Sequence, residues 1–583
     1  MPRSFEIIPN SRKNWIIAIC ILLYAVLFLQ YLNLQGLNYQ KYKRQSENNS
    51  IRKLSIPAPR GIIYDRNGIP LVDNMPIYEV KVRPIDVTEE FNYSILAEEL
   101  EFPEDELKAK ILKSKKSGGK YHPQLLKRHL DFEVISRLSE NRLNLPGIIF
   151  SELPARVYPS NANLTHIIGY LRTVSEDFLK DAPEELKYDR DDIYGATGIE
   201  SYYEHLLRGK NGFEYHLVDN RGIDHGILLD ENRTSPQKGE TLLLTIDHDL
   251  QVLVEKLLTN YKGTIVCSNP KTGEIHAIAS SPDYDLSSFV GPIPMDLWQN
   301  WNTDENRPLF NRAINGLYPP GSTLKLAAAA MLLETNKVTP NWSVNCGGVY
   351  NFGNRQYHCW KEDGHGKVNL KDAIKYSCNI YFYQLIQYFE LNQWADFMND
   401  FGFGYKTGID LEFESTGIIP TRKYLNNKYT SRGWAEGNLL SFVLGQGDVL
   451  ATPLQVLHMV NLIATNGLTG KLKLAKSNPT VTDTLNYSNK TWTFINNAMW
   501  HVVNGEKGTG ENAKPEIGVA RGKTGTAENP HGEPHSWFAG YTTLPNGEQL
   551  SLAIIVENAG KGSQIAAPMA KLIFNQFAGV KHD

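Results

Sequence analysis

The first apolar stretch of the chain is long enough to cross a membrane. Residues 15–34 carry no charge, and the run reaches the roughly 20 residues that a helix needs to span a bilayer. Arg12 and Lys13 stand directly before it, with Arg3 further upstream, and basic residues are typical of the cytoplasmic side. We therefore expect a cytoplasmic tail at 1–14 and an anchor helix after it. The run ends without a small-x-small cleavage pattern, which favours an anchor over a cleaved signal peptide.

Between this helix and residue 235 the apolar positions change their spacing several times. Residues 34–54 are polar and rich in Gln, Asn and Lys, which is typical of a helical stalk or linker. Residues 57–71 alternate short apolar runs with turn residues, and Asn67-Gly68 predicts a hairpin that opens a β-rich module. Residues 85–145 carry apolar side chains at helical spacing and predict mainly helices.

Beyond residue 235 the pattern predicts strands and helices in blocks. A boundary is expected near 225–240, before a strand-like run at 241–246. Such grouping predicts an α+β fold built on an antiparallel sheet, and 583 residues are too many for one hydrophobic core. The expected elements are a helix at 250–261, a hairpin at 264–268 and 274–280, neighbouring strands at 523–526, 536–542 and 550–556, and a final helix at 567–577.

Charge excludes one class of partner. The chain has 60 Lys and Arg against 64 Asp and Glu, a net charge of -4, and its basic residues form no long stripe. The locally basic stretch at 113–128 is diluted by Gly118-Gly119 and is expected to be solvated surface. Nucleic acid is therefore not an expected partner.

Candidate chemistry appears at residues 318–330. Pro319-Pro320-Gly321 interrupts a helix and the following residues favour one, so Ser322 falls at a helix start and Lys325 one turn later on the same face. A buried, neutral lysine near a helix N-terminus can accept the proton of a serine nucleophile. The alternative is an N-cap serine with a solvated lysine, since this spacing is common.

Two further motifs follow in order. Ser377-Cys378-Asn379 and Lys523-Thr524-Gly525-Thr526 complete the set Ser-x-x-Lys, Ser-x-Asn, Lys-Thr-Gly that β-lactamases and penicillin-binding proteins carry. Read alone, Ser377 and Asn379 could cap a helix end, and Lys523 could lie in an exposed turn. Three motifs in this order favour an acyl-transfer site.

Five cysteines allow a metal site or disulfides. Cys20 lies in the anchor, and Cys267, in an expected strand, is interpreted as a small core residue. The other three form with one histidine the spacing Cys-x12-Cys-x5-His-x12-Cys, which suits a closed tetrahedral zinc site but matches no standard finger. Free thiols and disulfides stay open as alternatives. The candidate ligands are Cys346, Cys359, His365 and Cys378.

Longer segments carry a family resemblance. Residues 59–68, 198–200, 318–325, 445–447 and 452–455 resemble class B penicillin-binding proteins, and residues 359–383 resemble the penicillin-binding protein 2 group, which acts in cell elongation. The resemblance implies a transmembrane helix at 15–34, an elongated, β-rich, non-catalytic pedestal at 35–235, and a transpeptidase domain at 236–583 with a serine β-lactamase-like fold. The catalytic domain is then expected outside the inner membrane.

The resemblance also implies a cofactor and a partner. It raises the expectation of one structural zinc ion at the four candidate ligands. Because no glycosyltransferase-like module fits between anchor and catalytic domain, sugar-chain polymerisation is expected from a membrane-embedded glycosyltransferase of the rod-shape (SEDS) family.

The catalytic roles implied by the resemblance fall on four residues. Ser322 attacks the carbonyl between the two terminal D-alanines of a peptidoglycan stem peptide and holds the peptide as an acyl-enzyme, with Lys325 as its base. Ser377 relays a proton to the leaving amine, and Asn379 holds Lys325 and the substrate amide. β-Lactams are expected to acylate the same serine.

The strand motif is expected to bind the substrate. Lys523 supplies positive charge near the substrate carboxylate, Thr524 and Thr526 supply hydroxyl contacts, and Gly525 lets the strand approach closely. The backbone N–H groups of Ser322 and Thr526 are expected to form the oxyanion hole.

Three alternatives stay open at this point. A D-Ala-D-Ala carboxypeptidase differs only in accepting water instead of an amine. A β-lactamase or β-lactam sensor shares the Ser-x-x-Lys motif, but the long pedestal disfavours the first and the absence of a visible signalling domain disfavours the second. An inactive cell-wall scaffold is disfavoured by the complete set of motifs.

Overall fold

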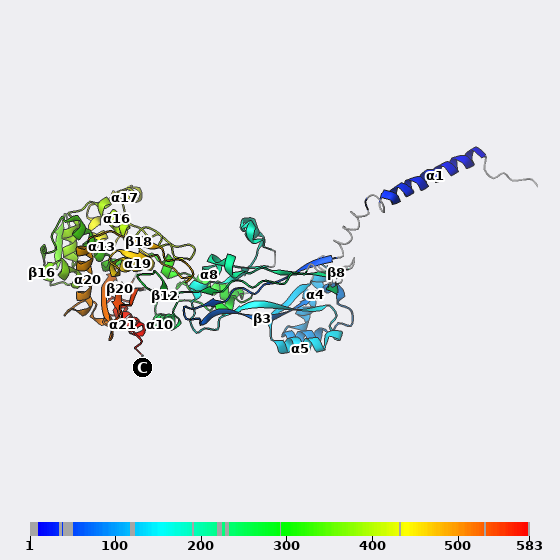
Figure 1. The fold of residues 1–583 in the computed structure, drawn as a ribbon, viewed down its shortest axis with the longest axis horizontal. Coiled ribbons are helices and arrows are strands. Elements are labelled where there is room, and N and C mark those ends of the chain that lie inside the picture. The colour runs from blue at the N-terminus through cyan, green and yellow to red at the C-terminus, as the bar shows by residue number, and fades with distance from the viewer. Residues whose placement is uncertain are drawn as a thin grey trace, which may run out of the picture. The chain divides into compact units, whose positions relative to one another are not determined.

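The computed structural model in Figure 1 describes residues 10–33, 38, 51–116, 123–188, 192–218, 224–227, 233–291, 293–430, 433–529 and 532–580. The chain forms two compact units, and each is assembled from separate segments of sequence. The first unit comprises Met1–Pro59, Pro76–Pro154 and Lys210–Lys238, and the second comprises Arg60–Met75, Ala155–Gly209 and Gly239–Asp583.

The N-terminal helix α1 (Asn10–Leu32) agrees with the predicted anchor. Within the described part of the chain, its residues Arg12–Leu32 form the one helix long and apolar enough to cross a membrane. Residues 34–37 and 39–50 of the predicted stalk lie outside the described residues. The end of that stretch is not helical, because Ile51–Ile56 forms strand β1. This corrects the predicted stalk at its C-terminal end.

The first unit is built from strands and short helices. β1 pairs with β8 and β8 with β9, while the second half of β3 pairs with β4. The prediction of mainly helices at 85–145 is partly wrong, because β4 lies inside it with Leu126 and Leu130 buried. The bounds are β3 (Pro70–Val82), α3 (Tyr93–Leu100), α4 (Glu104–Lys116), β4 (Gln124–Leu130), α5 (Phe132–Glu140), β5 (Ile148–Val157), β8 (Gly212–Val218) and β9 (Asp224–Ile227).

The predicted Asn67-Gly68 hairpin is present in the second unit. β2 (Ile63–Tyr64) pairs antiparallel with the start of β3, and Gly68 has a φ of 89°, which glycine adopts without strain. The strand expected at 241–246 is shorter than predicted, since β10 covers only Leu242–Leu243.

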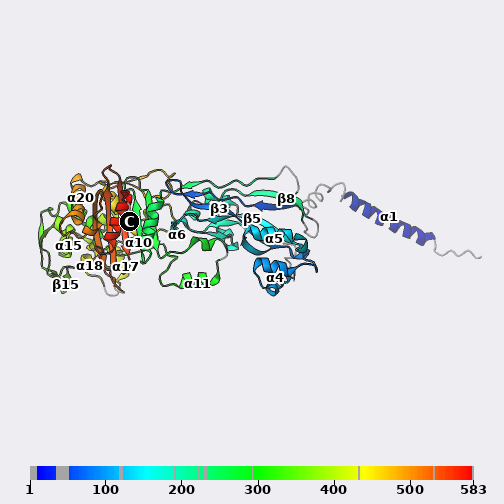
Figure 2. The same cartoon turned by 90° about the horizontal axis from the view of Figure 1, so that it is seen from below.

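An antiparallel five-stranded sheet forms the core of the second unit, as predicted. Its order is β12-β11-β21-β20-β19, and the predicted hairpin and the three C-terminal strands all belong to it. In Figure 2 the strands lie between α20 on one side and α10 on the other. The bounds are α10 (His248–Leu258), β11 (Gly263–Ser268), β12 (Ile275–Ser281), α20 (Asn489–Asn504), β19 (Val519–Ala527), β20 (His535–Thr543), β21 (Gln549–Val556) and α21 (Ala566–Phe577).

Alternate residues of the sheet serve two separate cores. Ile265, Cys267 and Ile554 pack with α10 and α21, whereas Val266 and Ile555 belong to the larger core on the other face. This alternation follows from the two-residue period of a strand. Cys267 is fully buried, which confirms its interpretation as a core residue.

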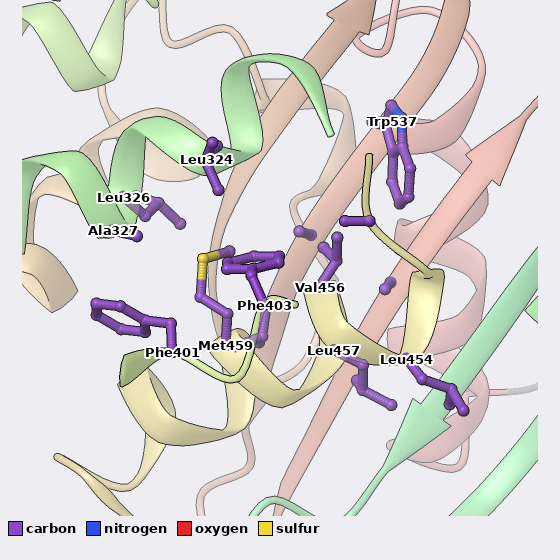
Figure 3. Packing of buried hydrophobic residues seen from close by; sticks show 14 of the residues in the cluster. Leu324, Leu326, Ala327, Phe401, Phe403, Leu454, Val456, Leu457, Met459 and Trp537 are labelled. Atoms are coloured by element: carbon purple, nitrogen blue, oxygen red, sulfur yellow. The ribbon is translucent and has the colours of Figure 1, made fainter. Parts of the chain in front are cut away.

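The larger core surrounds helix α19 (Pro453–Ala464), which is buried on all sides. Thr452 caps its start, with its side chain accepting from the backbone N–H of Gln455 while the Gln455 side chain accepts from the Thr452 N–H. Figure 3 shows Leu324, Phe403 and Met459 pointing toward one another between α19 and the start of α13 (Lys325–Thr335). Helix α13, which begins three residues after Ser322, therefore packs against a helix that is buried along nearly its whole length.

Candidate active site

Ser322 lies in a tight turn rather than in the first turn of an α-helix. The 3-10 turn Gly321–Leu324 leads directly into α13, and Gly321 has a φ of 55°, in the left-handed region that favours glycine. The Gly321 N–H donates to the carbonyl of Gly445 at 2.9 Å, and the indole N–H of Trp537 donates to the carbonyl of Pro319 at 3.1 Å. Two distant segments thus hold the turn from either side.

The hydroxyl of Ser322 is available to react. Its residue is half-buried, and among the described residues its Oγ makes no hydrogen bond, not even to Lys325. Lys325, three residues later, is fully buried. In free enzymes catalytic hydrogen bonds are often loose and tighten when substrate binds.

The ammonium group of Lys325 is held by the Ser377-Cys378-Asn379 loop. Its Nζ donates to Asn379 Oδ1 at 2.8 Å, to the carbonyl of Ser377 at 3.0 Å and to Ser377 Oγ at 3.4 Å. Burial lowers the pKa of Lys325 to about 8, because a charged amine is poorly solvated there. A useful fraction of this lysine is therefore neutral near physiological pH.

Ser377 occupies a strained backbone position between α14 (Leu370–Lys375) and α15 (Asn379–Ile386). Its φ is 54°, which non-glycine residues rarely adopt. The Cys378 N–H donates to the carbonyl of Ala373 at 2.9 Å, and Asn379 Nδ2 donates to the carbonyl of His358 at 3.2 Å. The neighbouring contacts hold the loop in this conformation.

Lys523 reaches the same hydroxyl from the sheet. It lies on β19, is fully buried, and donates to Ser377 Oγ at 2.9 Å and to the carbonyl of Thr524 at 2.8 Å. Burial lowers the pKa of Lys523 well below its ordinary value, and the charge of Lys325 lowers it further. Because Ser377 Oγ accepts from both lysines, its own proton is free to be donated elsewhere.

The three residues after Lys523 on β19 line the site next to the turn of Ser322. Thr524 Oγ1 donates to Thr509 Oγ1 at 2.9 Å, and Thr526 is exposed, its hydroxyl accepting from the Gly562 N–H at 3.4 Å. A Cβ on Gly525 would lie 2.8 Å from the Cβ of Trp537, so no larger residue fits. The strand can therefore lie close to the nucleophile turn.

The four candidate metal ligands also come together. Their ligand atoms all lie within 4.8 Å of one another, and His365 Nδ1 lies 3.5 Å from the sulfurs of both Cys346 and Cys359. All the cysteines are free. A hydrogen bond between the Cys378 and Cys359 sulfurs lowers the pKa of Cys359 and raises that of Cys378. Three thiols and one imidazole form a donor set that zinc prefers.

Several residues that touch the site carry no motif. Thr509 contacts Thr524, and Trp537 and Gly445 hold the nucleophile turn. Glu557 accepts from the Tyr318 hydroxyl at 2.7 Å and from Arg312 Nε at 2.9 Å, just before that turn. The spacing of residues in the sequence does not predict these contacts. Only Gly445 lies in a segment, Gly445-Gln446-Gly447, that resembles class B penicillin-binding proteins.

Comparison with known proteins identifies the family. The model of the penicillin binding protein transpeptidase domain matches residues 263–575, which include Ser322, Lys325, Ser377 and Lys523. The chain is a class B penicillin-binding protein. The model of the penicillin-binding protein dimerisation domain matches residues 55–244 of the same penicillin-binding protein.

Several relatives and solved structures of the penicillin-binding protein 2 group are similar to this penicillin-binding protein over nearly its whole length. The peptidoglycan D,D-transpeptidase MrdA of Haemophilus influenzae is 32% identical over 96% of this chain and 90% of its own length. The complex of penicillin-binding protein 2 and MreC from Helicobacter pylori matches 91% of this chain and 99% of its own with 28% identity and a TM-score of 0.80. A peptidoglycan synthase complex, solved to describe the coordination of polymerization and crosslinking, matches 99% of this chain and 100% of its own with 27% identity and a TM-score of 0.73.

Proposed function

We propose that this penicillin-binding protein is a serine D,D-transpeptidase that cross-links peptidoglycan stem peptides during cell elongation and is inhibited by β-lactams. The observation that carries the proposal is the convergence of two buried lysines on the hydroxyl of Ser377, beside the turn that presents Ser322. The similarity to MrdA supports the substrate and the cellular role.

In the acylation step Ser322 Oγ attacks the carbonyl between two D-alanines while Lys325 Nζ takes its proton. The backbone N–H groups of Ser322 and Thr526 stabilise the oxyanion. When the C–N bond breaks, Ser377 Oγ gives its proton to the departing D-alanine amine and recovers one through its hydrogen bonds to the lysines. An acyl ester on Ser322 remains.

In the second step an amine of a neighbouring stem peptide attacks the ester and loses a proton, and Ser322 regains one. Asn379 holds Lys325 in position through a hydrogen bond of 2.8 Å and in this proposal also binds the substrate amide. Lys523 supplies positive charge near the substrate carboxylate, and the hydroxyls of Thr524 and Thr526 contact that carboxylate.

Intact-mass spectrometry tests the acyl-enzyme. The full chain incubated with a fluorescent penicillin is expected to gain one penicilloyl group, and Ser322→Ala is expected to gain none. Absence of the adduct on the unsubstituted chain would favour an inactive scaffold. Rapid loss of the adduct by hydrolysis would favour a β-lactamase.

The acceptor is tested by product analysis. With uncross-linked strands that carry pentapeptides, we expect D-alanine release together with cross-linked dimers. D-alanine release with tetrapeptides alone would identify a carboxypeptidase instead.

We further propose that α1 anchors the protein in the inner membrane with the catalytic domain on the periplasmic side. Arg12 and Lys13 at the start of the helix support a cytoplasmic N-terminus. A reporter that is active only in the periplasm, fused after residue 583, is expected to be active.

We propose a membrane-embedded SEDS glycosyltransferase as partner. The similarity to a chain of a peptidoglycan synthase complex supports this pairing, since that complex couples polymerization to crosslinking. Failure of the two proteins to co-purify from membranes in mild detergent would contradict it.

We propose that Cys346, Cys359, His365 and Cys378 bind one structural zinc ion. Zinc–sulfur bonds of about 2.3 Å place tetrahedral donors about 4 Å apart, and the 4.8 Å limit on these four atoms supports the fit. The bound ion would neutralise the thiolates and tie the loop of Cys378 to the β-hairpin residues before it. Native and denaturing mass spectra are expected to differ by one zinc ion, and Cys346→Ser is expected to lose it and to lower the thermal midpoint.

A further inference from the structure

The second unit contains a polar groove that takes no part in the chemistry described above. Its volume is about 680 Å³, and it lies between α20, the neighbouring strands of the sheet and the end of α19. We call it the α20 groove. It is lined by Ala464, Asn466, Thr493, Asn496, Asn497, Trp500, Arg521, Tyr541, Thr543 and Gln549.

One face of α20 lines this groove. Thr493, Asn496, Asn497 and Trp500 follow the spacing i, i+3, i+4, i+7 and so share a face. The other side of the helix, including Ile495 and Met499, is fully buried in the core. The helix is therefore anchored by its apolar side and presents amides, a hydroxyl and an indole to the groove.

The polar groups of the groove are held in place by one another. The Tyr541 hydroxyl donates to Asn496 Oδ1 at 2.5 Å, and Asn496 Nδ2 donates to Asn466 Oδ1 at 3.1 Å and to the carbonyl of Ile463 at 3.0 Å. Gln549 Nε2 donates to Thr543 Oγ1 at 3.3 Å, whereas the buried Gln549 Oε1 has no partner among the described residues. Gln549 Oε1 is therefore open to a hydrogen-bond donor from water or from a bound molecule.

The groove has a single charge. Arg521 is the only charged residue that lines the groove, and among the described residues it contacts Tyr541 rather than a carboxylate. Its guanidinium lies 5.7 Å from the centre of the Tyr541 ring, which holds it at the wall of the groove. The groove thus offers amides and hydroxyls that can pair with sugar hydroxyl and acetamido groups, an indole, and one guanidinium without a carboxylate partner among the described residues. This is the chemistry that recognises an acidic glycan.

We propose that the α20 groove binds a peptidoglycan strand, with its N-acetylated sugars along α20 and a stem-peptide carboxylate on Arg521. This inference rests on the proposed function. Arg521 precedes Lys523 by two residues and lies on the same face of β19, so the strand motif of the active site and the groove share one rigid element. A strand in the groove would be held beside the active site that cross-links its neighbour.

The test measures binding with the catalytic serine blocked. The full chain in detergent is saturated with penicillin, and only protein whose mass shows one penicilloyl group is used. Binding of soluble glycan fragments of two to four disaccharides with intact stem peptides is then measured by ligand-observed NMR and by titration calorimetry. A protein that takes up no penicillin contradicts the proposed function, whereas an acylated protein that binds no fragment contradicts the groove alone.

Substitutions locate the site. Arg521→Gln is expected to weaken binding about tenfold, as is Asn497→Ala, which changes an exposed residue of the α20 face. Arg142→Gln, an exposed arginine of the first unit, is the matched control and is expected to bind like the unsubstituted chain. If Arg521→Gln fails to fold, as judged by its thermal midpoint, Asn497→Ala decides the question.

The ligand is varied in the same assay. The unsubstituted chain is expected to bind fragments without stem peptides about tenfold more weakly than fragments with them. Arg521→Gln is expected to bind the two kinds of fragment equally, because it lacks the carboxylate contact with either. Unchanged binding by Arg521→Gln or Asn497→Ala, or binding of stem peptides alone with full affinity, would overturn the proposal.

Discussion

Lys325 must be neutral to accept the proton of Ser322, and burial makes this possible near neutral pH. Its pKa is lowered to about 8, so the neutral form grows as pH rises through that value. We expect the second-order rate of acylation by penicillin to rise with pH and to level off above about 8, with a rate near pH 6 about a hundredth of the plateau. Stopped-flow measurements with a fluorescent penicillin check this, and a flat profile between those pH values would contradict it.

Ser377 combines a catalytic hydroxyl with a strained backbone, and two substitutions separate these properties. Ser377→Ala and Ser377→Gly both remove the acceptor shared by Lys325 and Lys523, so each is expected to slow acylation by about 10²–10⁴-fold. Only glycine relieves the left-handed φ of 54°, and the glycine variant is expected to be more stable than the alanine variant by about 1 kcal/mol. Thermal unfolding of the two variants measures this difference. Equal midpoints would show that the position carries no strain.

The strands that carry the site were predictable because their apolar and turn residues follow the period of a sheet. The hairpin around Gly68 and the three C-terminal strands are at the expected residues. β4 was not predictable in this way, since its leucines continue the helical spacing of α3 and α4 on one side and α5 on the other. A short segment between helices can take its conformation from the sheet that it joins. The partner strand of β4 is β3, which lies about 50 residues earlier, so the local sequence does not reveal the pairing.

Motif order and family resemblance predicted the residues that the structure brings together around Ser377, but not their contacts. Nothing in the spacing indicates that Lys325 and Lys523 meet at one hydroxyl, because they lie 198 positions apart and their meeting depends on how α13 packs on the sheet. The contacts of Trp537 and Glu557 with the segment around Ser322 were not predicted for the same reason.

At the level of elements, Glu557 supports the segment that leads into the nucleophile turn. It follows β21 and accepts from Tyr318 and Arg312, both of which are buried. Glu557→Gln leaves the Arg312 charge without its partner, so we expect a lower thermal midpoint and an acylation rate reduced by about tenfold. The pH at half-maximal rate should not move, because Glu557 does not contact Lys325.

The matched control for this experiment is Glu548→Gln, an exposed glutamate in the turn before β21. It is expected to unfold and react like the unsubstituted chain. An acylation rate for Glu557→Gln equal to that of the control would show that the contacts of Glu557 with Tyr318 and Arg312 do not position Ser322.

At the scale of the whole molecule, the anchor and the catalytic residues belong to different parts of the sequence. The proposed catalytic and substrate-binding residues lie between residues 322 and 526, and the matched dimerisation domain begins at residue 55. Removal of residues 1–50 is therefore expected to leave the rate of acylation by penicillin within about twofold, while the protein no longer sediments with membranes. A large loss of acylation would show that the terminal segment supports the catalytic unit.

The hydroxyl that joins the two lysines makes the site responsive to its substrate. Two ammonium groups that share one acceptor in a buried space repel each other, so a proton gained by one is lost more easily by the other. In the proposed function, a substrate carboxylate next to Lys523 would favour the charged form of that lysine and thereby the neutral, basic form of Lys325. In the proposed mechanism, the carboxylate that identifies the correct peptide would therefore also activate the nucleophile.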